Sequence, residues 1–165
     1  MNTDTGISET RIISGSVYPE LAKRVVDELG LEVTDHEGKE FSNTEHYVRI
    51  GTSVRNDRVF IIQSMAARND WTVDESIIET LLIIDATRRA SASSITVILP
   101  YLAYGRQDRK ARGREPISAA AIVRAFQSAG ADRIVSIDMH TAQTQAVFNG
   151  PFDHLTAEPE LIHAL

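Results

Sequence analysis

The sequence predicts an α/β fold in which helices flank a mostly parallel sheet, giving three layers. Three short apolar runs are typical of strands buried on both faces: Val59–Gln63, Ile95–Leu99 and Ile134–Asp138. Helical patterns separate these runs, and a helix between two strands favours a right-handed crossover with parallel pairing. A chain of 165 residues, 42% of them apolar, can form one domain with a substantial core.

The N-terminal part is expected to contain two strands and one helix. Arg11–Ser14 is a short β-prone run. A helix should begin at Pro19, because proline fits a first helical turn, and end at Gly30, which suits the conformation that follows a helix. Alternating apolar and polar residues predict a strand over Glu45–Ile50.

Three further helices are predicted. Asp74–Ala90 carries apolar residues at helical spacing, and Asp74 suits either the N-cap or the first turn. Ser118–Ala129 is a second helix. Glu158–Leu165 is a third, and it stops without a glycine or a cationic last turn. We therefore expect the chain to be a piece of a longer protein.

The composition limits the possible functions. A net charge of −6 argues against bulk binding of nucleic acid. The absence of cysteine excludes disulfides and thiolate metal sites, and it fits a reducing cytoplasm. No apolar run approaches the roughly 20 residues of a membrane span, and the polar start MNTDTGISETR does not resemble a signal peptide. We expect a cytoplasmic protein without nucleic-acid or membrane partners.

Common catalytic patterns are also missing. The sequence has no G-x-x-x-x-G-K-[ST] loop, no G-x-G-x-x-G after its first strand and no G-x-S-x-G turn. These absences disfavour a Walker-type kinase, a dinucleotide-dependent oxidoreductase and an α/β-hydrolase.

Polar segments follow the three buried strands, and ligands of parallel sheets bind outside the carboxyl ends of the strands. Gln63-Ser64 follow the first strand and Met139-His140 follow the third. The segment after the second strand contains five cations, namely Arg106, Arg109, Lys110, Arg112 and Arg114. Arginine can hold phosphate oxygens through two hydrogen bonds, which makes this loop a candidate polyphosphate site. A solvated charged loop explains the charge alone equally well.

Asp138-Met139-His140 is a second candidate. A carboxylate and an imidazole at a strand end can hold a divalent metal or orient a phosphate. The alternative is a helix-capping aspartate with a surface histidine, and these residues by themselves favour that alternative. The other histidines show no metal-ligand spacing and are interpreted as surface or packing residues: His36, His46, His154 and His163.

Several segments together resemble the ribose-phosphate pyrophosphokinases, or PRPP synthetases. Phe41–Glu45 (FSNTE) resembles the family's F-S-[DN]-x-E, Tyr104–Lys110 (YGRQDRK) its A-R-Q-D-[RK]-K loop, and Asp138–Gln143 (DMHTAQ) its D-L-H-A-x-Q. Asp85–Ala92 and Arg112–Ala119 fit in the same order, so the resemblance covers nearly the whole chain. It implies a Rossmann-like, type I phosphoribosyltransferase-like fold, with residues 1–165 as the N-terminal domain.

The resemblance implies three groups of site residues. Those that would contact adenine from a neighbouring subunit are Phe41, Asn43 and Glu45. Those that would bind the nucleotide and its phosphates are Arg106, Gln107, Asp108 and His140, with His140 also serving Mg²⁺. Those near the family's regulatory ADP or phosphate site are Arg49, Ser53 and Arg55.

The implied reaction transfers the β,γ-diphosphate of ATP to the 1-hydroxyl of ribose 5-phosphate, giving PRPP and AMP for nucleotide biosynthesis. The family forms homodimers that assemble into hexamers. Its ribose-5-phosphate loop and its catalytic Lys and Arg lie in a second half that is missing here, so we expect no catalytic residue and no turnover from this chain alone. Met65–Ile78, which contains the only tryptophan, Trp71, is longer than in the family and suggests different local contacts.

There are two alternatives to a working pyrophosphokinase domain. A catalytically silent relative would hold a nucleotide or act as a regulatory subunit. A purine-salvage phosphoribosyltransferase shares the fold type, but it needs an acidic phosphoribosyl-diphosphate loop that this sequence lacks.

Overall fold

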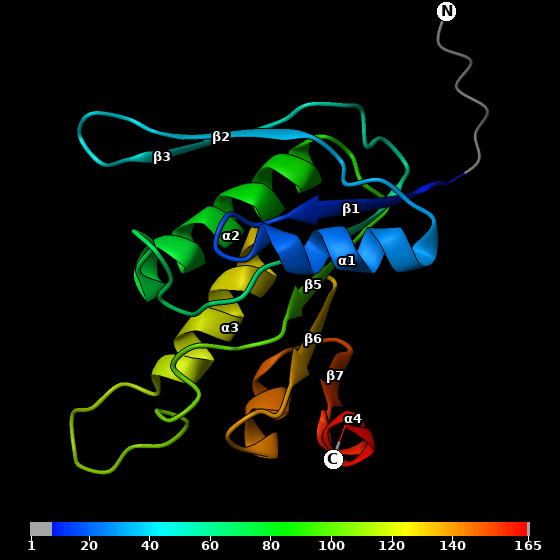
Figure 1. The fold of residues 1–165 in the computed structure, drawn as a ribbon. Coiled ribbons are helices and arrows are strands. Elements are labelled where there is room, and N and C mark those ends of the chain that lie inside the picture. The colour runs from blue at the N-terminus through cyan, green and yellow to red at the C-terminus, as the bar shows by residue number, and fades with distance from the viewer. Residues whose placement is uncertain (1–7, 165) are drawn as a thin grey trace, which may run out of the picture.

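A five-stranded, fully parallel sheet forms the centre of the molecule in the computed structural model, which describes residues 8–164 (Figure 1). The strands follow the order β1-β4-β5-β6-β7. Their bounds are β1 Thr10–Ser14, β4 Arg58–Ile62, β5 Ser94–Leu99, β6 Arg133–Ile137 and β7 Phe152–Leu155. The predicted parallel α/β fold is confirmed.

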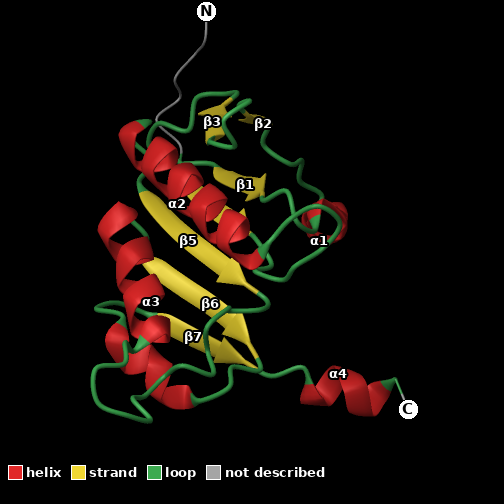
Figure 2. Ribbon diagram, turned by 90° about the vertical axis from the view of Figure 1, so that its left-hand side faces the viewer, coloured by secondary structure: helices red, strands yellow, loops and turns green. Residues whose placement is uncertain are grey.

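Helices cover both faces of this sheet (Figure 2). The helix α1 (Pro19–Leu29) lies on one face, whereas α2 (Val73–Arg89) and α3 (Ser118–Ala129) lie on the other. A short 3-10 helix, η1 (Ala142–Val147), follows β6, and α4 (Glu158–His163) extends away from the sheet without a buried residue. The predicted three layers are therefore present. None of the helices within residues 8–164 is long and apolar enough to cross a membrane.

Local signals set the helix ends. Pro19 opens α1, and Gly30 ends it in the left-handed conformation with a φ of 65°. Thr72 is the N-cap of α2 and forms a capping box with Glu75, which leaves Asp74 in the first turn, the second of its two predicted positions.

The core has two parts because side chains alternate across the strands. In β4, Val59 and Ile61 belong to the large cluster that contains side chains of α2 and α3. Ile62 instead belongs to a smaller cluster with Ala22 and Val26 of α1, against which Phe60 packs. Burial on both faces explains why this strand is a continuous apolar run in the sequence.

The N-terminal half also contains an antiparallel hairpin outside the main sheet. Its strands are β2 (His36–Glu40) and β3 (His46–Ile50), and β3 packs against α2. The sequence predicted β3 but not β2, because HEGKE has no apolar alternation, and β2 depends on pairing with β3. The edge strand β7 was also missed, since only four residues pair with β6.

Candidate functional site

The loops that follow β5 and β6 meet at the carboxyl edge of the sheet. The carboxylate of Asp108, after β5, accepts a hydrogen bond from the hydroxyl of Thr141, after β6, at 2.7 Å. His140 lies beside Gly105, because a Cβ added to Gly105 would lie 3.6 Å from the Cβ of His140. The structure therefore brings together the two segments that the sequence singled out.

The ionised form of the Asp108 carboxyl is stabilised by its surroundings. The hydrogen bond from Thr141 holds the pKa of the Asp108 carboxyl below its ordinary value, and the positive charges of Arg109 and His140 contribute less. Asp108 is therefore an ionised acceptor, placed where a cation or a donor group of a ligand can reach it.

Replacing Thr141 with valine should raise the pKa of Asp108 toward its ordinary value, because the donor is lost while the side-chain shape is nearly kept. An NMR titration of the Asp108 carboxyl measures this change. A carboxyl whose pKa is lowered by folding stabilises the fold at pH values above its pKa in the unfolded state. This stabilisation is lost as the pH falls through the pKa of the folded state. Thr141→Ser keeps the hydroxyl and should keep the low pKa; equal titration of the valine and serine variants would contradict the assignment.

The five cations between residues 106 and 114 are exposed. None of them forms an ion pair with an acidic residue in the part of the chain that the structure describes. Guanidinium groups without an internal partner are available to an anionic ligand, for which they provide charge-assisted hydrogen bonds.

The basic loop nevertheless has a defined backbone. The carboxylate of Glu115 accepts hydrogen bonds from the backbone N–H groups of Ala111 and Arg112, each at 2.8 Å. The hydroxyl of Ser118, at the start of α3, donates to Oε1 of Gln107 at 2.6 Å. The side chain of Gln107 thus helps to anchor the loop to α3.

A hollow of about 440 Å³ separates the start of the basic loop from the start of α2. Arg106 and Gln107 line one side, and Thr72 and Asp74 line the other. The hydroxyl of Tyr104 donates to Asp74 at 2.7 Å across this boundary, and the carboxylate raises the pKa of Tyr104. The volume lies within the range of small-molecule sites, roughly 300–1,000 Å³.

Asp138 has a structural partner of its own. It leaves β6 with a φ of 45°, and its carboxylate accepts a hydrogen bond from the backbone N–H of Ala157, the N-cap of α4. His154, which was interpreted as a surface or packing residue, accepts the backbone N–H of Met139 at 3.0 Å. The capping alternative therefore describes Asp138, while His140 stays exposed beside the basic loop.

The adenine-contact candidates Phe41, Asn43 and Glu45 do not join this site within one chain. They are exposed around the turn between β2 and β3, which lies far from the basic loop in Figure 1. Phe41 exposes 43% of its surface, and its ring contacts Tyr47 of β3 edge to face, with ring centroids 5.9 Å apart.

The regulatory candidates lie elsewhere again. Arg49 is in β3 and pairs with Glu37 at 3.8 Å. Ser53 and Arg55 precede β4, toward the amino ends of the parallel strands, and the hydroxyl of Ser53 accepts the backbone N–H of Arg55 at 3.5 Å. These three residues are thus separate from Arg106, Gln107 and Asp108.

A buried carboxylate at the carboxyl edge escaped the sequence reasoning. Glu79 of α2 is only 2% exposed. It accepts hydrogen bonds from the backbone N–H and the hydroxyl of Ser16 at 3.0 and 2.5 Å, and from the side-chain amide of Gln63 at 2.5 Å. A charged residue on the apolar face of the predicted helix was the signal that could have revealed it.

Comparison with known proteins gives this edge a context. Residues 10–130 match the family model described as the N-terminal domain of ribose phosphate pyrophosphokinase. The chain belongs to the ribose-phosphate pyrophosphokinase family. This finding confirms the resemblance seen in the motifs, and residues 10–130 include the basic loop.

Individual family members agree with this assignment. The ribose-phosphate pyrophosphokinase of Corynebacterium efficiens is 50% identical over 151 residues, which are 91% of this chain and 45% of that protein. The one from Streptomyces coelicolor is 48% identical over 158 residues, 95% of this chain and 47% of that protein. The crystal structure of phosphoribosylpyrophosphate synthetase from Mycobacterium smegmatis superimposes with a TM-score of 0.89 at 43% identity and covers 95% of this chain and 51% of its own. The chain spans about half the length of the curated relatives it matches.

Proposed function

We propose that this chain is the ATP-binding half of a ribose-phosphate diphosphokinase that makes PRPP and AMP from ATP and ribose 5-phosphate, for nucleotide biosynthesis. The observation that carries the proposal is the basic loop, whose cations form no ion pair within residues 8–164 and which one hydrogen bond and the packing of Gly105 on His140 hold against the segment after β6. Arg106, Gln107 and Asp108 would bind the nucleotide and its phosphates. Phosphoryl transfer depends mostly on positioning and on neutralising charge, which such a cationic loop can supply.

Mg²⁺ fits the donors at this edge. Magnesium is commonly held by one or two carboxylates together with substrate phosphates, and the hydrogen bond from Thr141 to Asp108 brings the carboxylate of Asp108 to the segment that contains His140. We assign His140, with Asp108 beside it, to the Mg–ATP complex. When bound, the ion would offset negative charge on the transferring phosphates.

The adenine contacts are proposed to come from a second copy of the chain. The turn between β2 and β3, which carries Phe41, Asn43 and Glu45, lies well apart from the loop that follows β5 (Figure 1), and none of the three lines the hollow beside Arg106. Their exposure at a projecting turn supports a contact with a neighbouring subunit in a dimer, and dimers would stack into the hexamer that the family resemblance implies.

An activity assay tests this proposal. The full protein, with this chain as its N-terminal half, should convert ATP and ribose 5-phosphate to AMP and PRPP in the presence of Mg²⁺, as measured by chromatography of the nucleotides. The 165-residue chain alone should show no turnover, because the sugar-phosphate and catalytic loops are assigned to the other half. Turnover by the isolated chain would overturn the division of roles. ATP binding without turnover by the full protein would instead favour a silent regulatory subunit.

A further inference from the structure

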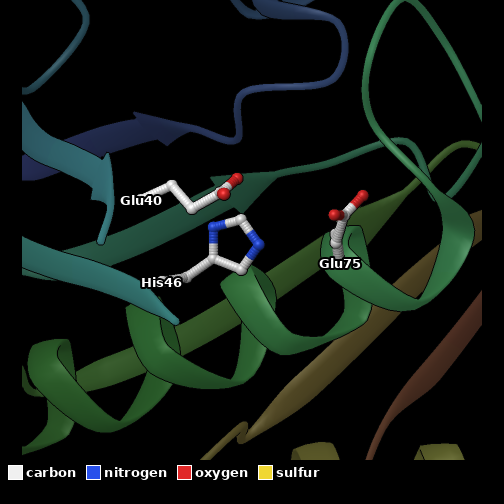
Figure 3. A group of neighbouring side chains, drawn as sticks. All are labelled: Glu40, His46 and Glu75. Carbon is white, nitrogen blue, oxygen red and sulfur yellow. The ribbon is translucent and has the colours of Figure 1, made fainter. Parts of the chain in front are cut away.

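Three side chains from separate elements converge beside the hairpin (Figure 3). They are Glu40 at the end of β2, His46 at the start of β3 and Glu75 in the first turn of α2. One ligand atom from each lies within 4.8 Å of the others. The imidazole stands between the two carboxylates (Figure 3), and a single ring nitrogen lies within 4.8 Å of a carboxylate oxygen of each. His46 was interpreted from the sequence as a surface or packing residue, because its companions are not at metal-ligand spacing.

The ring of His46 lacks a partner that its environment requires. Its Nε2 atom is buried and forms no hydrogen bond with any described residue. Trp71 stacks on the imidazole, with ring centroids 5.0 Å apart and planes 19° from parallel. Since a buried polar atom without a partner costs free energy, the geometry indicates a bound species that completes this site.

Trp71 lies in Met65–Ile78, the segment that the family resemblance implies to be longer than usual. Arg68 and Trp71 exchange two backbone hydrogen bonds of 3.1 and 2.9 Å, which close a tight turn. The side chain of Arg68 also pairs with Glu20 of α1 at 2.9 Å. The turn is therefore fixed at both sides, and it holds the indole over His46.

The surrounding charge favours a cation. The hollow at this position has a volume of about 280 Å³, and Asp70 and Glu79 line it as well. Lys39 also lines it, but its ammonium lies over the ring of Tyr47, 4.9 Å from the centroid. The walls therefore present several carboxylates around a single imidazole.

We propose that Glu40, His46 and Glu75 bind a divalent transition-metal ion, with Zn²⁺ as the best match. Imidazole nitrogen and carboxylate oxygen are ordinary zinc ligands, and three protein ligands leave a further position for water. One oxygen of Glu75 accepts the backbone N–H of Thr72 at 2.6 Å, which orients the carboxylate and leaves its other oxygen for the metal. The ion would link the hairpin to α2, at the base of the Phe41–Glu45 turn.

Zinc titration of the full 165-residue chain tests the site. Trp71 is the only tryptophan, and it stacks on His46, so its fluorescence reports directly on this ring. We expect one Zn²⁺ per chain by isothermal titration calorimetry, with a fluorescence change that saturates at the same ratio. Loss of a group that merely orients a ligand costs metal sites about 10–100-fold in affinity, so His46→Gln should weaken binding by about 100-fold or more.

Matched variants separate this site from adventitious binding. His36→Gln alters a histidine of the same hairpin that is not part of the group, and it should leave zinc affinity unchanged. Glu75→Gln removes a ligand charge but keeps a residue that serves the capping box equally well, so it should fold normally and bind zinc weakly. If His46→Gln does not fold, Glu75→Gln and Glu40→Gln decide. Absence of saturable binding, or equal affinity in the His36 variant and the site variants, would overturn the proposal.

Discussion

Replacing Arg106 with alanine in the full protein is expected to lower kcat/KM for PRPP formation by about 100-fold or more, the usual cost of removing one preorganised group that stabilises transition-state charge. The guanidinium is exposed and lines the hollow beside α2, and no internal hydrogen bond or ion pair among the described residues occupies it. Loss of this guanidinium should therefore weaken the interaction with the bound nucleotide and leave the fold intact. Steady-state assays that vary ATP and ribose 5-phosphate separately measure the effect.

Arg124 provides the matched control for this variant. It is an exposed arginine of α3 that does not line the hollow, so Arg124→Ala should keep nearly full activity. Circular dichroism of both variants checks that the fold is retained. A rate unchanged by Arg106→Ala would remove the basic loop from the proposed site.

The second large effect concerns stability. Replacing Glu79 with leucine should lower the free energy of unfolding by about 3–4 kcal/mol, because three donors of Ser16 and Gln63 then lose their buried acceptor. Glu79→Gln keeps the shape and one acceptor oxygen, and it should cost about half as much. Urea unfolding followed by circular dichroism gives both values, provided that the m-value is unchanged.

Gly15 offers an independent route into the same network. A Cβ at this position would lie 2.2 Å from Cδ of Gln63, so Gly15→Ala must displace that side chain from Glu79. The loss from a combined Gly15→Ala and Glu79→Leu variant should be smaller than the sum of the single losses, because both break one network. Full additivity of the two losses would show that Gln63 and Glu79 do not act together.

Strong local patterns explain how much of the fold the sequence predicted. The apolar runs of β4, β5 and β6 are buried between layers, and burial on both faces leaves a simple signal in the residues. Pro19 and Gly30 mark the ends of α1 through their own backbone preferences. By contrast, β2 is almost entirely exposed and is defined by its pairing with β3, so no pattern within HEGKE could reveal it.

The candidate site, like the fold, was predicted only in part from the sequence. The basic loop and Asp138-Met139-His140 could be found from the sequence because polar segments after buried strands must lie at one edge of a parallel sheet. The sequence did not reveal which side chains of these two segments contact each other. In the structure, Thr141 donates a hydrogen bond to Asp108, and Asp138 accepts one from the N-cap residue of α4. These contacts could not be predicted because they depend on the paths of the loops, which no periodicity in the sequence encodes.

The amino-acid sequence by itself determined the alternation of the buried strands β4, β5 and β6 with helices, the concentration of cations after β5 and the family to which the chain belongs, because these depend on local periodicity and on contiguous motifs. Only the tertiary structure decided that Glu79 is the buried acceptor of Ser16 and Gln63, and that Glu40, His46 and Glu75 share one hollow. Such groups join residues far apart in the chain. Their proximity arises from the packing of the hairpin and the strand ends against α2, which becomes fixed only when the layers assemble.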